Sequence, residues 1–255
     1  MGIIKKAFLK TTPLEEVQLV LASASPRRLA LLAQIGLDPH HVYAPNIDET
    51  AKVREHPANL AKRLAKAKAL KVQETLKLQE SVLCSKQNNQ KTSVQKKVIL
   101  AADTVVAVGS VILPKPEGEN EAYECLRFLS GRTHKVYGAI CALNENGKAT
   151  VKLVESRVRF RRLNTVIIDA YLASGEWQGK AGGYAIQGKA GAFVVHIMGS
   201  YSNVVGLPLT ETMDLLMEYQ FPVLSHWTGE IHGTGEIHGT GEIHGKNLSI
   251  GTIVE

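Results

Sequence analysis

The chain has 255 residues, of which 44% are hydrophobic and 21% charged, a balance that is ordinary for a soluble globular protein. No apolar run approaches the roughly 20 residues that a membrane-spanning helix needs, so we expect no membrane partner. The three cysteines (Cys84, Cys125, Cys141) are odd in number and have no metal-ligand spacing. This usage favours free thiols and a cytoplasmic location.

The formal net charge of +6 is concentrated between Lys52 and Lys97, where twelve Lys and Arg residues stand against three Asp and Glu residues. Such a field attracts phosphates, whether on a nucleotide, a nucleic acid or a membrane. A solvated helix face followed by a basic loop would give the same composition. Aromatic residues make up only 5% of the chain and do not alternate with the basic ones. Nucleic-acid binding by stacking therefore has little support, and we expect no nucleic-acid partner.

The first predicted elements are a strand at 17–22 and a helix that follows it directly. Ser25 suits the N-cap position, Pro26 suits the first helical position, and Gly36 stands just beyond the apolar pattern. Three independent signals thus predict a strand, a tight turn and a helix.

Strands and helices alternate through the rest of the chain. A second helix is predicted from Pro57 to about Thr75, followed by a polar insertion or flexible loop at 76–97. The strongest strand covers 98–108, and its nearly continuous apolar character predicts burial on both faces. The remaining predicted elements are a helix and two strands, at 120–129, 135–143 and 149–160. This alternation predicts an α/β fold.

The C-terminal part has a different composition. The hexapeptide Thr-Gly-Glu-Ile-His-Gly occurs three times in tandem, from Thr228, Thr234 and Thr240. An isoleucine every six residues resembles a left-handed β-helix, but three hexapeptides would close a single coil with no neighbour to bury its core. We therefore predict one domain at 1–227 and a disordered repeat tail at 228–255.

The turn Ser23–Arg28 carries the first candidate binding residues. A helix N-terminus presents unpaired backbone N–H groups and a partial positive charge, and both favour an anion. Arg27 and Arg28 stand in the first turn, where cations are unfavourable for the helix dipole, and a bound phosphate would offset this cost. Two surface arginines paired with distant carboxylates would give the same pattern, and this segment alone does not favour either interpretation.

Lys68 shares an i, i+4 row with Leu60, Leu64 and Val72 on the second predicted helix. It is therefore expected along or beside the buried stripe of that helix. A lysine in this position either extends its ammonium to water or points it into a cleft, and the spacing does not distinguish the two.

Asp103 stands in the middle of the strongest apolar strand. Burying a carboxylate there is costly unless it meets a metal, a cation or hydrogen-bond donors. Acids at such positions in α/β sheets are commonly metal ligands or general bases, which we favour over a structural salt bridge. Asp48 and Glu49, in a turn-like stretch, offer a second carboxylate for a divalent cation.

The segment 180–209 is rich in glycine, which implies tight turns and close approach of the backbone to a ligand. Within it, Gln187 presents an amide donor and a carbonyl acceptor side by side, matching the edge of a nucleobase. This setting between glycines makes Gln187 a candidate base-binding residue.

Together these segments resemble the Maf family of nucleotide pyrophosphatases, from roughly Leu19 to Leu216. The resemblance is specific because several long motifs occur in the family's order: Ser23–Arg28, Asp48-Glu49, Arg63-Leu64-Ala65 with Lys68-Ala69, Ala102–Val106, Lys115-Pro116, Ser130–His134, Lys180–Gly188 and Gly199–Leu209. The chain departs from the family at Pro114, where glycine is usual, and in the length of 76–97.

This resemblance implies a pyrophosphatase that hydrolyses dTTP and UTP to the monophosphate and pyrophosphate. The implied fold is α/β, an elongated mixed sheet flanked by helices, with the nucleotide in a cleft between two lobes. Asp103 would be the general base and, with Glu49, would hold a divalent metal cation, Mg²⁺ or Mn²⁺. The implied substrate-binding residues are Ser25, Arg27, Arg28, Lys68, Thr104, Lys115 and Gln187. Among them Arg27, Thr104 and Gln187 match the dTTP/UTP branch.

A hypothesis of another class is a cell-division (septum) regulator that acts through protein partners, binding nucleotides with little turnover. Such a protein would lose Asp103 or the lysines before it lost its core, and all of these are present. The sequence therefore favours an enzyme. Whether it forms a homodimer is left open.

Overall fold

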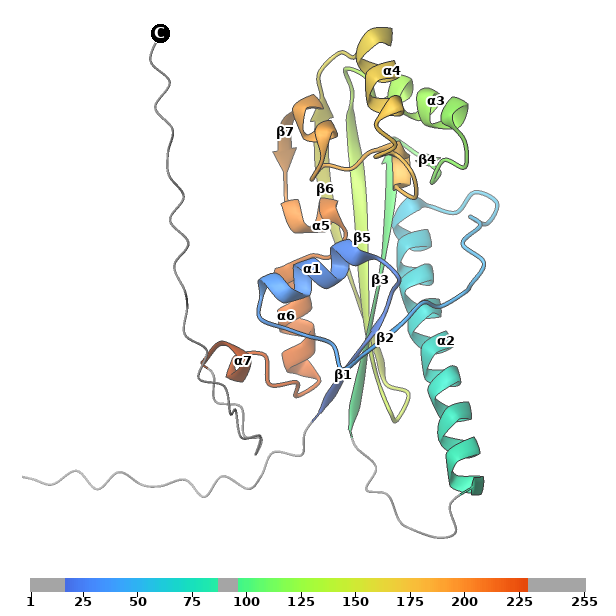
Figure 1. The fold of residues 1–255 in the computed structure, drawn as a ribbon, viewed down its shortest axis with the longest axis vertical. Coiled ribbons are helices and arrows are strands. Elements are labelled where there is room, and N and C mark those ends of the chain that lie inside the picture. The colour runs from blue at the N-terminus through green and yellow to red at the C-terminus, as the bar shows by residue number, and fades with distance from the viewer. Residues whose placement is uncertain (1–16, 87–95, 229–255) are drawn as a thin grey trace, which may run out of the picture.

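The computed structural model describes residues 17–86 and 96–228. At its centre is a mixed sheet with the strand order β2-β1-β3-β5-β6-β7 and β4 paired to β3 off this path (Figure 1). The strands are β1 (Gln18–Ala22), β2 (His41–Tyr43), β3 (Lys97–Val108), β4 (Val111–Leu113), β5 (Thr133–Asn144), β6 (Ala149–Phe160) and β7 (Val194–Met198). The pairs β1–β2 and β1–β3 are parallel, and the other pairs of the described sheet are antiparallel.

One edge of β3 is covered by two separate strands. β1 pairs with β3 from Lys97 to Ala101, and β4 pairs with it from Val106 to Val108. Residues 102–105 therefore have a strand neighbour on the opposite edge, β5, and none between β1 and β4 in the described sheet. The chain leaving β1 and the chain leaving β4 both reach this open stretch, because each strand ends beside it.

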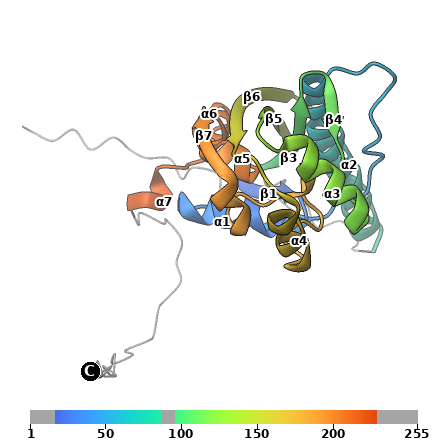
Figure 2. The ribbon, with the colours of Figure 1, turned by 90° about the horizontal axis from the view of Figure 1, so that it is seen from above.

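Helices cover both faces of the sheet (Figure 2). The helix α2 (Pro57–Lys86) packs on one face, against β3 and β5. The cluster on the other face takes residues from α1 (Pro26–Gln34), α3 (Glu119–Leu129), α4 (Thr165–Ala173), α5 (Tyr201–Val205) and α6 (Leu209–Glu218). Shorter elements are the 3₁₀ turns η1 (Ala181–Gly183) and η2 (Lys189–Phe193) and the helix α7 (Ser225–Thr228).

The buried row of α2 explains how this long helix is held. Leu60, Leu64, Val72 and Leu76 recur at multiples of four residues, all are buried, and they pack against the apolar residues of β3 and β5. Lys68 falls in the same row and is only 6% exposed. The expectation that Lys68 lies on the buried stripe is confirmed.

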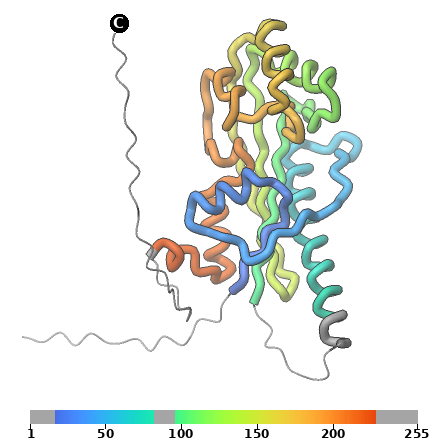
Figure 3. The backbone as a smooth tube through the Cα atoms, viewed as in Figure 1, coloured from blue at the N-terminus to red at the C-terminus, as the bar shows by residue number. Residues whose placement is uncertain are grey.

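The molecule is elongated, with α3, α4 and β4 towards one end and β1, β2 and α6 towards the other (Figure 3). The long strands β3, β5 and β6 connect the two ends. This arrangement confirms the predicted mixed α/β sheet flanked by helices. No helix among the described residues is long and apolar enough to cross a membrane.

The expectation of a flexible loop at 76–97 is wrong for its first part, because α2 continues to Lys86. Leu, Lys, Gln and Glu are frequent in this part, and all four are strong helix formers. Leu76 moreover extends the buried row by one turn. Residues 87–95 of the expected insertion lie outside the described residues, as does the repeat tail from 229 onwards.

Candidate active site

A cavity of about 340 Å³ lies at the open stretch of β3. It is lined by the chain leaving β1, the start of α1, the loop 44–56, α2, β3, the chain leaving β4, and the segments after η1 and in α5. The nine residues named from the sequence as catalytic, substrate-binding or metal-binding line this one cavity: Ser25, Arg27, Arg28, Glu49, Lys68, Asp103, Thr104, Lys115 and Gln187. Asp48, the other carboxylate of the Asp48-Glu49 pair, is exposed and is not part of the lining.

The N-terminus of α1 faces this cavity. Ser25 is the N-cap residue in an extended conformation, as predicted, but its side chain makes no capping hydrogen bond. Pro26 stands at the start of the helix, and the first turn contains no acidic residue. The partial positive charge of the helix end is therefore not offset by a carboxylate of its own first turn.

Arg28 is buried and is held by uncharged acceptors. Its Nε donates to the carbonyl of Gly206 at 2.8 Å, Nη1 to Oγ of Ser23 at 2.9 Å, and Nη2 to Oγ1 of Thr104 at 3.3 Å. Burial lowers the pKa of Arg28, whereas the nearby Asp103 raises it. A guanidinium has five N–H donors, so two remain beyond these three bonds for a ligand in the cavity.

Arg27 and Lys180 form a second cationic part of the lining. Burial lowers the pKa of Arg27. Burial, and then the charge of Arg27, lower the pKa of Lys180, whose Nζ donates to the carbonyl of Gln178 at 2.9 Å. Among the described residues, neither cation has a carboxylate within ion-pair distance. Two neighbouring cations without such a partner favour an anionic ligand.

Charges of alternating sign cross the cavity from Lys115 to Asp103. The Nζ of Lys68 lies 2.6 Å from Oδ1 of Asp103 and 2.6 Å from Oε1 of Glu49. The other oxygen of Glu49, Oε2, pairs with Nζ of Lys115. Asp103 is only 3% exposed. Lys68 therefore supplies the cation that a buried carboxylate requires.

Strand alternation explains why Asp103 and Thr104 have different partners. Neighbouring side chains of a strand point to opposite faces, so Asp103 points to α2 and Lys68, and Thr104 points to α1 and Arg28. Because no strand of the described sheet covers this edge between β1 and β4, both residues reach the same cavity.

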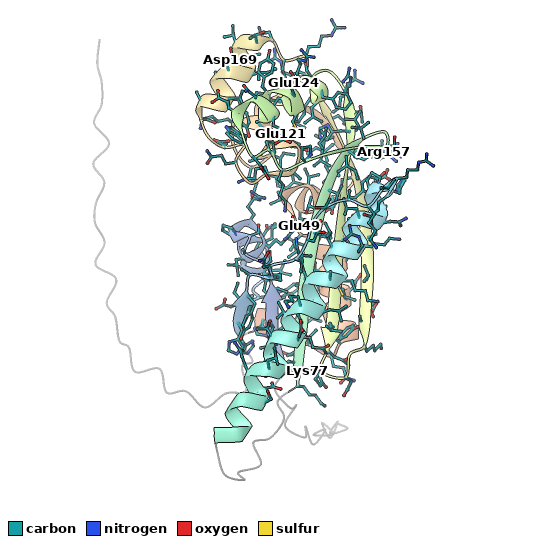
Figure 4. All side chains as sticks on the ribbon, turned by 90° about the vertical axis from the view of Figure 1, so that its right-hand side faces the viewer. Glu49, Lys77, Glu121, Glu124, Arg157 and Asp169 are labelled. Atoms are coloured by element: carbon teal, nitrogen blue, oxygen red, sulfur yellow. The ribbon has the colours of Figure 1, made fainter. Side chains whose placement is uncertain are left out.

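Glu49 stays ionised over a wide pH range. Its partial burial raises the pKa, but hydrogen bonds from Lys115 and Lys68 and the charges of both lysines outweigh this effect, bringing the pKa to about 2. Figure 4 shows Glu49 beside α2, between the ends of the elongated molecule.

The segment after β4 and the segment around η1 are joined by backbone contacts. Gly182 has a positive φ of 71°, and its N–H donates to the carbonyl of Pro114 at 2.8 Å. A Cβ at Gly182 would stand 3.1 Å from a methyl of Val106 in an already left-handed conformation, so a side chain is disfavoured here. This close approach brings the segment that carries Gln187 to the cavity wall.

Tyr184 lines the cavity and anchors this segment to the core. Its hydroxyl lies 2.8 Å from Nε2 of His134, and both rings pack edge-on against Phe160. Burial lowers the pKa of His134 to about 4 and raises the pKa of Tyr184. Both side chains are therefore neutral near pH 7. The N–H of Ala185 donates to the hydroxyl of Tyr171 at 3.0 Å, which adds a second anchor.

Sequence reasoning gave no role to Lys180 or Tyr184, although both lie in the glycine-rich motif. Their partners are far away in the chain: the charge of Arg27 lowers the pKa of Lys180, and His134 shares a hydrogen bond with Tyr184. One signal for the Tyr184 contact was available in the sequence. His134 belongs to the family motif Ser130–His134, and a polar side chain that is buried needs a partner.

The carboxylates that line the cavity are Glu49 and Asp103. No group of three or more His, Cys, Asp or Glu side chains that could hold a metal gathers within the described residues. A cation bound here would take two carboxylate ligands from the protein and further oxygen ligands from a substrate or water. Mg²⁺ is commonly held in this way at phosphate sites.

Comparison with known proteins places the chain among close relatives. The family model described as "Maf-like protein" matches residues 18–219. A protein of Bartonella quintana named dTTP/UTP pyrophosphatase is 74% identical over 90% of this chain and 99% of its own length. Proteins of the same name from Bartonella henselae and Brucella abortus are 74% and 53% identical, over 91% and 84% of this chain and 100% and 98% of their own lengths. The chain belongs to the Maf family.

Proposed function

We propose that the protein hydrolyses dTTP and UTP to the nucleoside monophosphate and pyrophosphate. The observation that carries this proposal is the cavity in which a buried carboxylate, Asp103, lies beside several cations and a helix N-terminus. The name shared by relatives that are 74% identical supports the same reaction and the same substrates.

The cations of the cavity would bind the triphosphate. Arg27 and the two remaining donors of Arg28 would contact phosphate oxygens beside the N-terminus of α1, where Ser25 keeps a hydroxyl without a capping bond. Lys68 and Lys115 have N–H donors beyond those that Glu49 and Asp103 accept, and these would bind further phosphate oxygens. Negative charge builds up on the leaving pyrophosphate as its bond to the α-phosphorus breaks. These cations therefore stabilise the transition state more than the bound substrate.

Asp103 would act as the general base. Its Oδ1 accepts a hydrogen bond from Lys68, which fixes the carboxylate and leaves Oδ2 to accept a proton from water. The water oxygen attacks the α-phosphorus, and the bond from this phosphorus to the bridging oxygen of the β-phosphate breaks. The electron pair of the broken bond stays on pyrophosphate, and the proton held by Asp103 passes to solvent.

Glu49 and Asp103 fit a divalent metal cation, Mg²⁺ or Mn²⁺. The two carboxylates lie close together, because Nζ of Lys68 lies 2.6 Å from an oxygen of each. Hard divalent cations prefer such ligands. When bound, the cation would supply Lewis-acid polarisation of the phosphate oxygens.

Thr104 and Gln187 would read the pyrimidine base. Oγ1 of Thr104 accepts a hydrogen bond from Arg28, so the hydroxyl proton of Thr104 points away from Arg28. Gln187 stands in the segment anchored by Tyr184 and lines the same cavity. An amide offers one donor and one acceptor to a base edge, and a pyrimidine ring presents a matching pair.

A panel of nucleoside triphosphates with pyrophosphate detection, run with and without Mg²⁺, tests the proposal. dTTP and UTP should release pyrophosphate much faster than dATP and dGTP, and removal of the metal should suppress the release. Equal rates on purines and pyrimidines would contradict the assignment of the base-reading residues. No release from any nucleotide, with nucleotide binding retained, would favour the division-regulator hypothesis instead.

A further inference from the structure

Arg63 of α2 holds the loop 44–56 by a fork of hydrogen bonds. Its Nε donates to Oε1 of Glu55 and its Nη2 to Oε2 of Glu55, each at 2.8 Å, and Nη2 also donates to the carbonyl of Thr50 at 2.9 Å. The hydrogen bonds from Arg63 lower the pKa of Glu55 to about 2, so the pair stays charged above that pH. The mechanism proposed above does not use Arg63.

This loop needs such an anchor because it has no regular secondary structure. It leads from the end of β2 to the start of α2 and is seen in Figure 3 as the light-blue tube beside that helix. Three hydrogen bonds within the loop are local: Lys52 N–H to Oε2 of Glu55, Glu55 N–H to the carbonyl of Lys52, and Thr50 N–H to Oδ1 of Asp48. Side chains also tie the loop to the rest of the molecule, because Glu49 pairs with Lys68 and Lys115, and Ile47 and His56 pack against the core and Tyr137. The bond from Arg63 to the carbonyl of Thr50 adds a hold on the loop backbone directly beside Glu49.

Glu49 directly precedes Thr50, whose carbonyl Arg63 binds. The carboxylate of Glu49 then contacts Lys68, five residues after Arg63 on the same helix. One cation of α2 therefore fixes the backbone next to Glu49, and another binds its side chain. Because both cations belong to one rigid helix, the position of Glu49 relative to Asp103 depends on the Arg63 fork.

We propose that Arg63 is a positioning residue that acts through Glu49, holding that carboxylate at Lys68 and Lys115 for catalysis. This proposal rests on the function proposed above for Glu49. The planar fork of an arginine matches the two oxygens of Glu55 and the carbonyl of Thr50 together, whereas the single ammonium of a lysine does not.

The test is a double-mutant cycle with Arg63→Gln and Glu49→Gln. Arg63→Gln alone should lower kcat/KM by roughly tenfold to a hundredfold at limiting Mg²⁺, since misplacing a site residue has costs of this size. Arg63→Lys should lose less. In the Glu49→Gln background, Arg63→Gln should cause no further loss beyond about twofold, because its target is already absent. Losses that multiply would show that Arg63 acts independently of Glu49 and would overturn the proposal.

Lys71→Gln is the matched control, because Lys71 forms an exposed ion pair with Glu74 on the same helix. It removes one positive charge from α2 without touching the loop, so it should leave kcat/KM unchanged. A loss equal to that of Arg63→Gln would mean that the charge of the helix matters rather than the fork, which contradicts the proposal.

Hydrogen exchange separates this proposal from the proposed function. The amides of Thr50 and Lys52 should exchange at least several-fold faster in Arg63→Gln than in the wild type, and at the wild-type rate in Lys71→Gln. Unchanged exchange in Arg63→Gln would overturn the positioning role whatever the activity. Faster exchange combined with full activity of Glu49→Gln would instead remove Glu49 from the proposed mechanism, while the anchoring of the loop by Arg63 would stand.

Discussion

Asp103 combines burial, a cationic partner and access to the cavity. It is only 3% exposed, and burying a carboxylate without a partner costs free energy, which Nζ of Lys68 at 2.6 Å offsets. Thr104, its neighbour in β3, bonds Arg28 on the other face. Two adjacent residues of one strand thus connect the carboxylate side and the arginine side of the cavity.

Replacing Asp103 by Asn should separate turnover from binding. The amide keeps the volume of the carboxylate but cannot accept a proton from water, so pyrophosphate release should fall by roughly a hundredfold or more. Nucleotide affinity, measured by calorimetry on the same protein, should change much less because Arg27, Arg28 and Lys115 remain. Near-normal turnover over a pH series would mean that Asp103 is a structural acid, with Glu49 the next candidate for the base.

Replacing Gln187 by Ala should weaken the choice of base. A base edge left without its hydrogen-bond partner in a closed site costs about 1–3 kcal/mol, so the ratio of kcat/KM for dTTP over dATP should fall by a corresponding factor. Gln178→Ala is a suitable control, because Gln178 is exposed and contributes its backbone carbonyl, which the variant keeps. An unchanged ratio in Gln187→Ala would exclude it as a base-reading residue.

The amino-acid sequence alone identified some site residues better than others. Asp103 was predictable from physics, since an acid in an apolar strand needs a partner. The turn-like stretch offered both Asp48 and Glu49 as a metal-binding carboxylate, and the family resemblance chose Glu49. Lys115 also stands in an irregular segment, so its role came from the resemblance alone, and the structure has both Glu49 and Lys115 in the cavity lining. The Arg63–Glu55 fork was not foreseen, because its geometry depends on how a loop folds back on a helix.

At the scale of elements, His134 of β5 and Tyr184, the residue after η1, join two parts of the chain that are far apart in the sequence. These side chains share a hydrogen bond in the core, while Nδ1 of His134 has no partner among the described residues. The folded protein therefore favours the neutral imidazole, and its pKa of about 4 lies below the ordinary 6.5.

This lowered pKa predicts a loss of stability in mild acid. Between pH 6.5 and 4 the unfolded chain binds a proton at His134 that the folded chain does not, so the free energy of unfolding falls as the pH falls. The contribution is complete above pH 6.5, and its loss by pH 4 amounts to about 3 kcal/mol. Urea unfolding at several pH values should show this fall in the wild type and a smaller one in His134→Gln. Parallel curves for the two proteins would contradict it.

At the end of α2, the average composition of a long stretch hid a helical part. The stretch 76–97 as a whole is rich in Lys, Gln, Asn and Ser, yet 76–86 contains good helix formers and Leu76 packs against the sheet. By contrast, the start of α1 and the core of β3 were predictable within a residue or two, because capping chemistry and a buried apolar run are local signals. The short strands β2 and β7 depend on distant partners, and the local pattern did not indicate them. The strand β4 pairs back on β3 after only two residues, but its three residues are too few to show a clear alternation.

At the scale of the whole molecule, the site exists because β1 and β4 leave part of one edge of β3 uncovered. Residues 102–105 lie in this gap, and the turn after β1 and the chain after β4 both reach it. The cavity therefore takes residues from both ends of the elongated sheet. Strand pairing between distant segments creates this gap, so the sequence could predict the class of fold but not the position of the cavity.

Truncation after Trp227 should leave the catalytic domain intact. The family match ends at 219, and Trp227 Nε1, which donates to the carbonyl of Ile35 at 2.6 Å, would be kept. Activity and melting temperature should be nearly unchanged. Truncation after Leu224 would remove that hydrogen bond from the end of α1 and should lower the melting temperature by several degrees. Equal losses in both proteins would show that the residues beyond Trp227 also stabilise the domain.

In the proposed mechanism, water activated at Asp103 attacks the α-phosphorus of a pyrimidine nucleoside triphosphate. Hydrolysis of dTTP in water enriched in ¹⁸O, followed by mass spectrometry of both products, tests this directly. We expect the label in the monophosphate and none in the pyrophosphate. Label in the pyrophosphate would place the attack on the β-phosphorus, and release of single phosphates would mean a different bond is cut. Either result would contradict the mechanism proposed for this cavity.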